Sequence, residues 1–127
     1  MVKMIYCVRR LPTLGEEEFH KYWFETHGPL VLERAKAMRV KRYIQSHTIP
    51  DTSEVPLNET VKQSRNAMEP FDGAAELWWE SMEELIASAS DPEGAKAAEE
   101  LLEDERNFID FSRSSLFFVE EHVIVSG

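Results

Sequence analysis

The segment FHKYWFETHGPLV, residues 19–31, sets the first constraint on the fold. Its aromatic residues recur at positions i, i+3 and i+4, the spacing that places side chains on one face of an α-helix. Pro29 disfavours helical geometry at the residue before it, so we expect this helix to end in a hinge at Gly28. Proline is also favoured at the first helical position, so a new helix can begin at Pro29. The hinge would leave His27 at a helix end, where the aromatic face of the helix meets a sheet.

The residues before this segment predict a strand and a helix start. Residues 2–9, VKMIYCVR, form a short apolar run rich in β-favouring side chains, as in a strand buried on both faces. Thr13 matches a helix N-cap, and Glu16 three residues later completes a capping box. Three consecutive glutamates from Glu16 onward then fall in the first turn, where the helix dipole favours carboxylates.

The residues after the segment predict a helix, a second strand and a long connection. The stretch PLVLERAKAM continues as a helix to about Met38, and residues 40–49, VKRYIQSHTI, have the composition of a strand. Residues 50–71 carry three prolines and no regular period, although a short helical turn can form near NETVKQ. Connections of this length act as lids, contact a partner subunit or stay disordered, and the sequence leaves these three options open.

The C-terminal half repeats the same order of elements. Residues 72–81 read as the third strand and residues 114–125 as the fourth. Between them, Ser81 matches an N-cap for the helix MEELIASAS, and the pair Asp91 and Pro92 starts another helix. Two β-α-β units predict an α+β, ferredoxin-like fold, in which helices cover one face of a four-stranded antiparallel sheet.

The uncovered face of this sheet predicts a homodimer. In a single domain of residues 1–127 with this fold, the second face would remain apolar. Its apolar side chains would be Leu77, Trp79, Phe117 and Val119, or their alternates along the same strands. A large exposed apolar patch usually marks an interface, so we expect two copies of the chain to pack sheet to sheet.

Composition and charge restrict the partners and the location. The chain is 43% hydrophobic and 30% charged, as globular proteins are. A formal net charge of −10 argues against nucleic acid and against anionic membranes, because both attract basic patches. No run approaches the roughly 20 apolar residues that a membrane helix needs. The single cysteine, Cys7, cannot form an internal disulfide, which favours a cytoplasmic location.

Three segments together resemble the EthD family of the dimeric α/β-barrel superfamily. FHKYWFETHGPLV is similar to the family's Phe-x-x-x-Trp-x-x-x-His-x-Pro-Leu helix motif, and KRYIQSH to its Arg-Tyr strand ending in a histidine. FDGAAELWWESMEEL is similar to its Asp-Gly-x-Ala-Glu-Leu-Trp strand, and FFVEEHVIV to its closing strand. The resemblance covers nearly the whole chain except residues 50–70. It implies two ferredoxin-like protomers packed sheet to sheet, each with a pocket between its sheet and its helices.

The resemblance also implies a range of chemistries. Members of the family look like lactone isomerases, fungal polyketide dehydratases or decarboxylases, and polyketide cyclases. We therefore expect a cofactor-free lyase or isomerase that acts on a small aromatic, lactone or polyketide-like molecule by acid/base catalysis. Two alternatives stay open: a non-catalytic dimer that binds a small apolar or aromatic ligand, and a cofactor-free mono-oxygenase, an oxidoreductase whose substrate itself activates oxygen.

Three residues are candidates for catalysis. His27 matches the histidine of the helix motif, and a helix C-terminus can tune an imidazole as an acid or base near neutral pH. Tyr43 and His47 are four residues apart on a strand and therefore share a face, with Gln45 between them. Such a row could bind a carbonyl and stabilise an enolate as the neighbouring carbon loses a proton. The alternatives are a histidine that only ends a helix and a row of structural polar residues.

Four residues are candidates for substrate binding. Trp23 can wall the pocket, and Gln45 shares the face of the catalytic candidates. Trp78 and the tryptophan after it point to opposite faces of the third strand, so one can lie near a helix and the other in the dimer core. If the other face of the second strand lines the pocket, Arg42 can bind a carboxylate instead. Glu76 is a further carboxylate candidate, with an ion pair to a basic residue of the second strand as the alternative.

No motif points to a metal or a cofactor. The histidines lack the HExxH spacing and the spacing of two histidines with a carboxylate. The sequence also contains no P-loop and no GxGxxG. We therefore expect neither a metal nor a cofactor.

Overall fold

The four strands pair into one antiparallel sheet in the order β2-β3-β1-β4. The computed structural model describes residues 1–127. The strands are β1 (Val2–Val8), β2 (Arg42–His47), β3 (Gly73–Trp79) and β4 (Ser115–Val119). This arrangement confirms the predicted ferredoxin-like α+β fold. The second and fourth strands are shorter than predicted.

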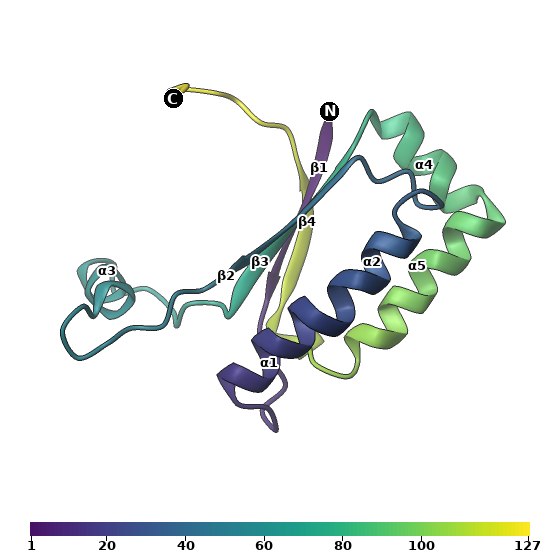
Figure 1. Cartoon of the computed structure of the whole chain (residues 1–127). Helices are drawn as coiled ribbons and strands as arrows, with labels where there is room; N and C mark the ends of the chain where they lie inside the picture. Colours follow the sequence, from purple (N-terminus) through teal and green to yellow (C-terminus); the bar gives the residue numbers. More distant parts are fainter.

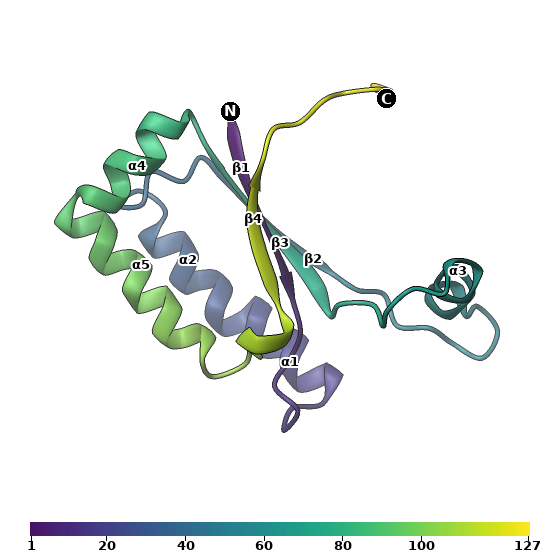
Figure 2. The same ribbon diagram turned by 180° about the vertical axis from the view of Figure 1, so that it is seen from behind.

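One layer of helices covers one face of the sheet (Figures 1 and 2). The first part of this layer is α1 (Glu16–Tyr22), η1 (Trp23–His27) and α2 (Gly28–Arg34). The second part is α4 (Met82–Ser90) and α5 (Pro92–Glu105), and the short turn η2 (Phe111–Arg113) leads into β4. No helix is both long enough and apolar enough to cross a membrane.

The caps of the second half are those that the sequence predicts. Ser81 Oγ accepts a hydrogen bond from the Glu84 backbone N–H at 3.2 Å. The carboxylate of Asp91 accepts one from the Glu93 backbone N–H at 3.1 Å. These bonds satisfy donors that the first turn of a helix leaves without a partner.

The predicted cap at Thr13 is wrong. The chain turns back between Leu11 and Leu14, whose backbone atoms are hydrogen-bonded at 3.0 Å, so Thr13 lies inside this turn. The N-cap is Gly15, and the carboxylate of Glu18 accepts a hydrogen bond from its backbone N–H at 3.3 Å. Glu18 therefore completes the capping box at Gly15, the role that was expected of Glu16 at Thr13.

The hinge predicted at Gly28 is also wrong, because the helix continues through this residue. Gly28 has ordinary helical angles, φ −52° and ψ −51°, and its backbone N–H donates to the Trp23 carbonyl, five residues earlier. In an α-helix the ring of Pro29 would clash with the carbonyl four residues before it, and its missing N–H would break the hydrogen-bond ladder. The π-helical turn η1 inserts one residue into the helix here, so the chain absorbs the proline by a wider turn.

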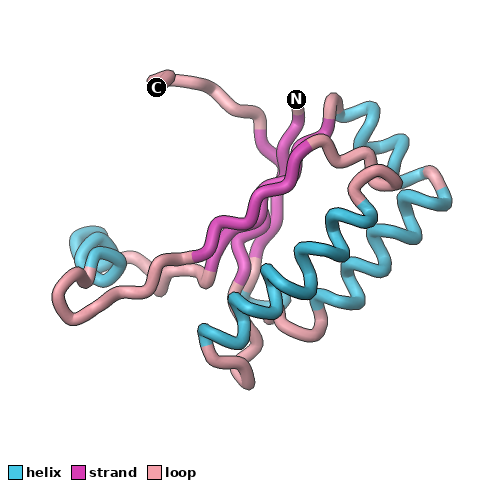
Figure 3. Tube along the Cα trace, viewed as in Figure 1, coloured by secondary structure: helices cyan, strands magenta, loops and turns pink.

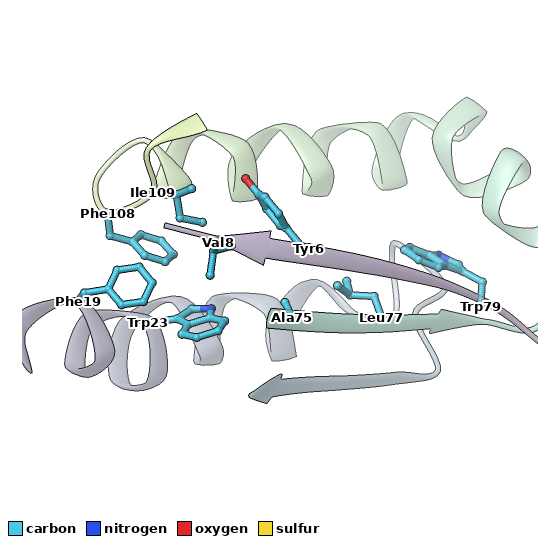
Figure 4. Packing of buried hydrophobic residues seen from close by; sticks show 9 residues of the cluster. All are labelled: Tyr6, Val8, Phe19, Trp23, Ala75, Leu77, Trp79, Phe108 and Ile109. Atoms are coloured by element: carbon cyan, nitrogen blue, oxygen red, sulfur yellow. The ribbon is translucent and has the colours of Figure 1, made fainter. Parts of the chain in front are cut away.

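The core forms where the aromatic helix face meets the sheet. Trp23, Phe19, Phe108 and Val8 are the largest fully buried side chains (Figure 4). Gly73, the first residue of β3, permits this packing, because a Cβ atom built there would lie 2.6 Å from the Trp23 ring. The same Cβ atom would lie 2.4 Å from the Ser46 carbonyl oxygen. The absence of a side chain at Gly73 therefore allows Trp23 and β2 to approach β3 closely.

The substitution Gly73→Ala should destabilise the protein by roughly 2–3 kcal/mol, because one of the two clashes is with backbone that cannot move aside. Urea unfolding followed by tryptophan fluorescence measures this change. Gly15→Ala is the matched control, since a Cβ atom there would meet only the end of the Glu18 side chain, at 3.6 Å. Equal unfolding midpoints for the two variants would contradict the close approach at Gly73.

On the uncovered face of the sheet, the outward-facing residues of β4 are those predicted, whereas those of β3 are the alternates. The register of β4 against β1 places Phe117 and Val119 on this face, as predicted, and Phe117 is 44% exposed. In β3, however, Leu77 and Trp79 are buried on the helix face, so the alternate residues of this strand face outward. The central strands are thus less apolar on this face than predicted, and its apolar part lies toward β4.

The connection between β2 and β3 forms an arm that extends away from the helical layer (Figure 3). Its helix α3 (Leu57–Arg65) occupies the place where the sequence allowed a short helical turn. No residue of α3 is buried, and Leu57 and Val61 are exposed. The C-terminal residues 120–127, which were expected in part to extend the fourth strand, leave the sheet on the same side as the arm (Figures 1 and 2).

Candidate functional site

A groove of about 350 Å³ lies between β2 and the helix that contains η1. One wall is a polar row on β2: Tyr43, Gln45 and His47. The other wall is mostly apolar and consists of Phe24, Gly28, Pro29 and Leu32. An apolar surface with a few polar groups on one side is typical of sites that bind small molecules.

The polar row forms one hydrogen-bonded network with the helix. The Gln45 side-chain nitrogen donates to the Trp23 carbonyl oxygen and to the Tyr43 hydroxyl, both at 2.8 Å. The Gln45 side-chain oxygen lies 2.8 Å from His47 Nε2. His47 Nδ1 in turn lies 2.7 Å from His20 Nδ1. The structure therefore brings together three of the predicted site residues, and it adds His20.

Aromatic stacking holds the histidines of this network in place. The His47 ring lies 4.3 Å from the buried Trp23 ring, measured between centroids. The His20 ring meets Phe19 edge to face at 5.2 Å. Trp23 therefore packs against His47 of the polar row and does not line the groove, contrary to the predicted role in its wall.

The Tyr43 hydroxyl is a hydrogen-bond donor at physiological pH. Burial raises the pKa of Tyr43 to about 12, although hydrogen bonds from Gln45 and Trp23 oppose this rise. The negative charge of Glu105 contributes to the rise. A protonated phenol at the groove can polarise a carbonyl oxygen, whereas it cannot act as a base near neutral pH.

His27 lies next to the groove but does not line it. Its imidazole is buried against Phe108, with ring centroids 4.9 Å apart. Nδ1 lies 2.7 Å from one carboxylate oxygen of Asp104, and the Tyr22 hydroxyl donates to the other oxygen at 2.6 Å. The structure thus pairs His27 with α5, whereas the neighbouring Gly28 faces the row on β2.

The electrostatics of this pair favour a neutral imidazole. Burial lowers the pKa of His27, and the opposing effect of Asp104 is smaller. Burial alone would raise the pKa of Asp104, but hydrogen bonds from Tyr22 and His27 outweigh it and lower that pKa. The Nδ1–H of neutral His27 therefore donates to the Asp104 carboxylate, which leaves Nε2 with a free lone pair.

Solvent reaches this second nitrogen. No hydrogen bond engages His27 Nε2, and no buried side-chain nitrogen or oxygen in the structure lacks a partner. Nε2 must therefore be accessible, although only 5% of the residue is exposed. A carboxylate that orients an imidazole whose other nitrogen is accessible is an arrangement suited to a general base.

Glu105 is a second half-buried carboxyl group, and the sequence did not single it out. The Tyr6 hydroxyl donates to it at 2.9 Å. Burial raises the pKa of Glu105 to about 7, and the charge of Asp104 adds to the rise, while the hydrogen bond from Tyr6 opposes it. Asp104 and Glu105 lie in an acidic helix with no distinctive motif. The helical period of the sequence could have indicated that Glu105 lies on the inner face of α5, because it follows the buried Leu101 by one turn.

The pKa of Glu105 predicts a pH-dependent stability difference between the native protein and Glu105→Gln. The folded state prefers the protonated carboxyl, so native stability falls as pH rises from about 4.5 to about 7, by up to about 3 kcal/mol. Gln cannot ionise, so this variant should be similar to the native protein at pH 4.5 and more stable above pH 7.5. Urea unfolding across this range measures the difference. The exposed Glu99→Gln, on the same helix, should show no such trend, and a parallel pair of curves for Glu105→Gln would rule out the raised pKa.

Arg42, Trp78 and Glu76 lie on the sheet face opposite the groove. The Arg42 guanidinium and the Lys3 ammonium each lie 5.0 Å from the centre of the Trp78 ring. Glu76 accepts a hydrogen bond from Lys3 at 2.6 Å, so its ion pair is with β1 and not with β2. The second Lys3 partner is Glu121, at 3.1 Å. These residues form a charged cluster on the open face and are not brought together with Tyr43.

A larger hollow of about 470 Å³ lies at the base of the arm and is lined mainly by charged residues. The protein itself satisfies its arginines. Arg9 donates to the carbonyl oxygens of Glu69 at 2.8 Å and of Pro70 at 3.1 Å, and Arg10 pairs with Asp72 at 2.6 Å. No group of three or more His, Cys, Asp or Glu side chains is placed to hold a metal ion here or elsewhere. The groove beside Tyr43 is therefore the better candidate site.

Residues 11–112 match the model of the EthD domain, so the chain belongs to the EthD family. This membership confirms the resemblance that the three sequence motifs indicated.

Solved structures of several bacterial proteins share the fold of this chain. An EthD family protein from Bacillus halodurans C-125 is 19% identical, with 96% of this chain and 99% of that chain covered and a TM-score of 0.60. An EthD-like protein from Ralstonia eutropha JMP134 is 17% identical, with coverage of 98% and 95% and a TM-score of 0.61. A dimeric protein of unknown function and ferredoxin-like fold from Bacteroides fragilis NCTC 9343 is 12% identical, with coverage of 94% and 95% and a TM-score of 0.57.

Proposed function

We propose that the protein is an acid/base enzyme of the lyase or isomerase type that acts on a small aromatic, lactone or polyketide-like molecule without a cofactor. The observation that carries this proposal is the protonated phenol of Tyr43 at the polar wall of an otherwise apolar groove. The apolar wall suits a ring or a short carbon chain. The phenol suits the carbonyl oxygen of that molecule.

In this mechanism Tyr43 donates a hydrogen bond to the carbonyl oxygen of the substrate. Negative charge grows on this oxygen as the adjacent carbon loses a proton, so the hydrogen bond stabilises the enolate more than the ketone. His27 accepts the carbon-bound proton at Nε2, with Asp104 holding the imidazole by Nδ1. The free lone pair at Nε2 and the carboxylate that holds Nδ1 support this assignment.

Proton exchange in deuterium oxide tests this mechanism without knowledge of the natural reaction. An enzyme that forms an enolate should exchange the α-protons of 2-tetralone for deuterium, and likewise the γ-protons of an α,β-unsaturated γ-lactone. Tyr43→Phe and His27→Asn should each slow this exchange roughly 10²-fold or more. Asn retains a donor near the position of Nδ1 and so can preserve the contact with Asp104 while it removes Nε2. NMR follows the exchange.

His122, exposed in the C-terminal segment, supplies the control, and His122→Asn should exchange at the native rate. Two results would contradict the proposal and favour an alternative. Saturable binding without exchange would favour a non-catalytic binding protein. Oxygen uptake with a phenolic substrate would favour a cofactor-free mono-oxygenase.

We propose further that two copies associate through the open face of the sheet. Phe117 and Val119 give this face an apolar part, and the charged cluster around Trp78 gives it polar contacts. The arm with α3 and the C-terminal residues both extend on this side (Figures 1 and 2), with Val61 and Ile124 among their exposed apolar side chains. The dimeric description of the Bacteroides fragilis protein supports the proposal. The arm would then contact the partner subunit.

Phe117→Glu should shift the protein toward monomer, because a carboxylate would be buried without a partner in an interface of this kind. Light scattering at micromolar concentration measures the mass. Ile86→Glu is the control, because Ile86 is 59% exposed on α4, on the helical side of the molecule. A monomeric native protein at this concentration would contradict the proposed dimer.

A further inference from the structure

The network of the groove determines where its protons lie, and it starts at the π-turn. The Trp23 carbonyl oxygen can only accept hydrogen bonds. It lies 2.8 Å from the amide nitrogen of Gln45. The reverse orientation of this amide would place two oxygen atoms in contact without a proton between them. The Gln45 side chain is therefore held with its nitrogen toward the helix and its oxygen toward His47.

This orientation fixes the tautomers of both histidines. The Gln45 oxygen only accepts, so His47 Nε2, at 2.8 Å, must carry a proton. Neutral His47 then has a lone pair at Nδ1, and burial together with the neighbouring His20 lowers the pKa of His47. The His20 nitrogen 2.7 Å from this lone pair must be the donor. His20 is thus protonated at Nδ1, and the residue also lines the polar hollow at the base of the arm.

At the Tyr43 end of the network, only one hydrogen-bond donor remains for a ligand. Both hydrogens of the Gln45 amide are used, one on the Trp23 carbonyl and one on the Tyr43 hydroxyl oxygen. Tyr43 accepts this bond, so its own O–H is free to donate. Both nitrogens of His47 are occupied, and it has no free site for substrate. Along the polar wall, the Tyr43 O–H is therefore the donor left for a ligand.

We propose, on the basis of the function inferred above, that His20, His47 and Gln45 are positioning residues that keep the Tyr43 O–H directed to the ligand, and that the groove selects molecules with a hydrogen-bond-accepting oxygen. The ligand class is a carbonyl compound or its oxyanion. A ligand group that can only donate hydrogen bonds is disfavoured, because the Tyr43 oxygen already accepts from Gln45. His47 thus acts through Gln45 and does not exchange a proton with the substrate.

Nitrogen-15 NMR of the imidazole rings tests the proton positions directly and needs no ligand. At pH 8.5, about two units above the ordinary imidazole pKa, His20 should be the Nδ1–H tautomer and His47 the Nε2–H tautomer. The variants His20→Asn and His47→Asn assign the signals among the four histidines of the chain. The opposite tautomer at His47, or a rapidly averaging mixture at both rings, would overturn the proposal.

A pair of matched probes tests the effect on selectivity. Acetophenone and α-methylstyrene have nearly the same shape, but only acetophenone has an accepting oxygen. In His20→Phe, which keeps a ring but removes the donor, the preference for acetophenone over α-methylstyrene should fall roughly tenfold, because Tyr43 loses its fixed orientation. His20→Asn, whose amide can replace Nδ1–H, should restore it. A role of His20 in packing alone would weaken both probes equally and would overturn the proposal.

The two experiments separate this proposal from the function on which it rests. If the predicted tautomers are found and neither probe binds, the proposed function fails while the positioning of Tyr43 stands. If α-proton exchange depends on Tyr43 but the selectivity of His20→Phe equals that of the native protein, the function stands and the positioning role fails.

Discussion

The carbonyl oxygen of Trp23 is the acceptor on which the candidate site depends. Pro29 cannot take its place in a regular α-helix, so the chain widens by one residue and forms η1. The Trp23 carbonyl accepts from the Gly28 backbone and also from the side chain of Gln45 on β2. One irregularity in the helix thereby fixes the orientation of an amide on the sheet, and through it the polar wall of the groove.

The packing of Trp23 gives this contact its rigidity. Its ring is 1% exposed and lies against the bare backbone of Gly73 on one side and the ring of His47 on another. A close-packed interior does not deform gradually, so the carbonyl of this residue has one position relative to β2. The residues that hold the groove in shape are consequently core residues, whereas the ligand would contact Tyr43 and the apolar wall.

A second cluster lies at the end of α5 and consists of hydrogen-bonded ionisable groups: Tyr6, Tyr22, His27, Asp104 and Glu105. Burying a carboxyl group is costly unless it is hydrogen-bonded, and both carboxyl groups here receive hydrogen bonds from tyrosines. Asp104 remains ionised because three donors reach it, from Tyr22, His27 and Asn107, whereas Glu105, with one donor, has a pKa of about 7. Asp104 is thus ionised at neutral pH and orients His27, whereas the adjacent Glu105 titrates near neutral pH.

The sequence was sufficient for the fold, and for part of the site. Strand and helix periodicity determine which elements form, and the caps at Ser81 and Asp91 follow from local chemistry. The π-turn could not be predicted, because proline rules indicate a break and do not say how a packed helix absorbs one. The three polar residues of β2 could be assigned to one face by alternation. Their proton positions could not, since these depend on the Trp23 carbonyl, a backbone acceptor whose place opposite Gln45 is set by the π-turn.

A crystal structure of the protein with acetophenone bound tests most directly whether the groove beside Tyr43 is the functional site. The proposed function predicts that the ring lies against the apolar wall of Phe24 and Leu32, with the carbonyl oxygen about 2.6–3.0 Å from the Tyr43 hydroxyl oxygen. Acetophenone bound elsewhere, or bound in the groove with its carbonyl directed away from Tyr43, would contradict it.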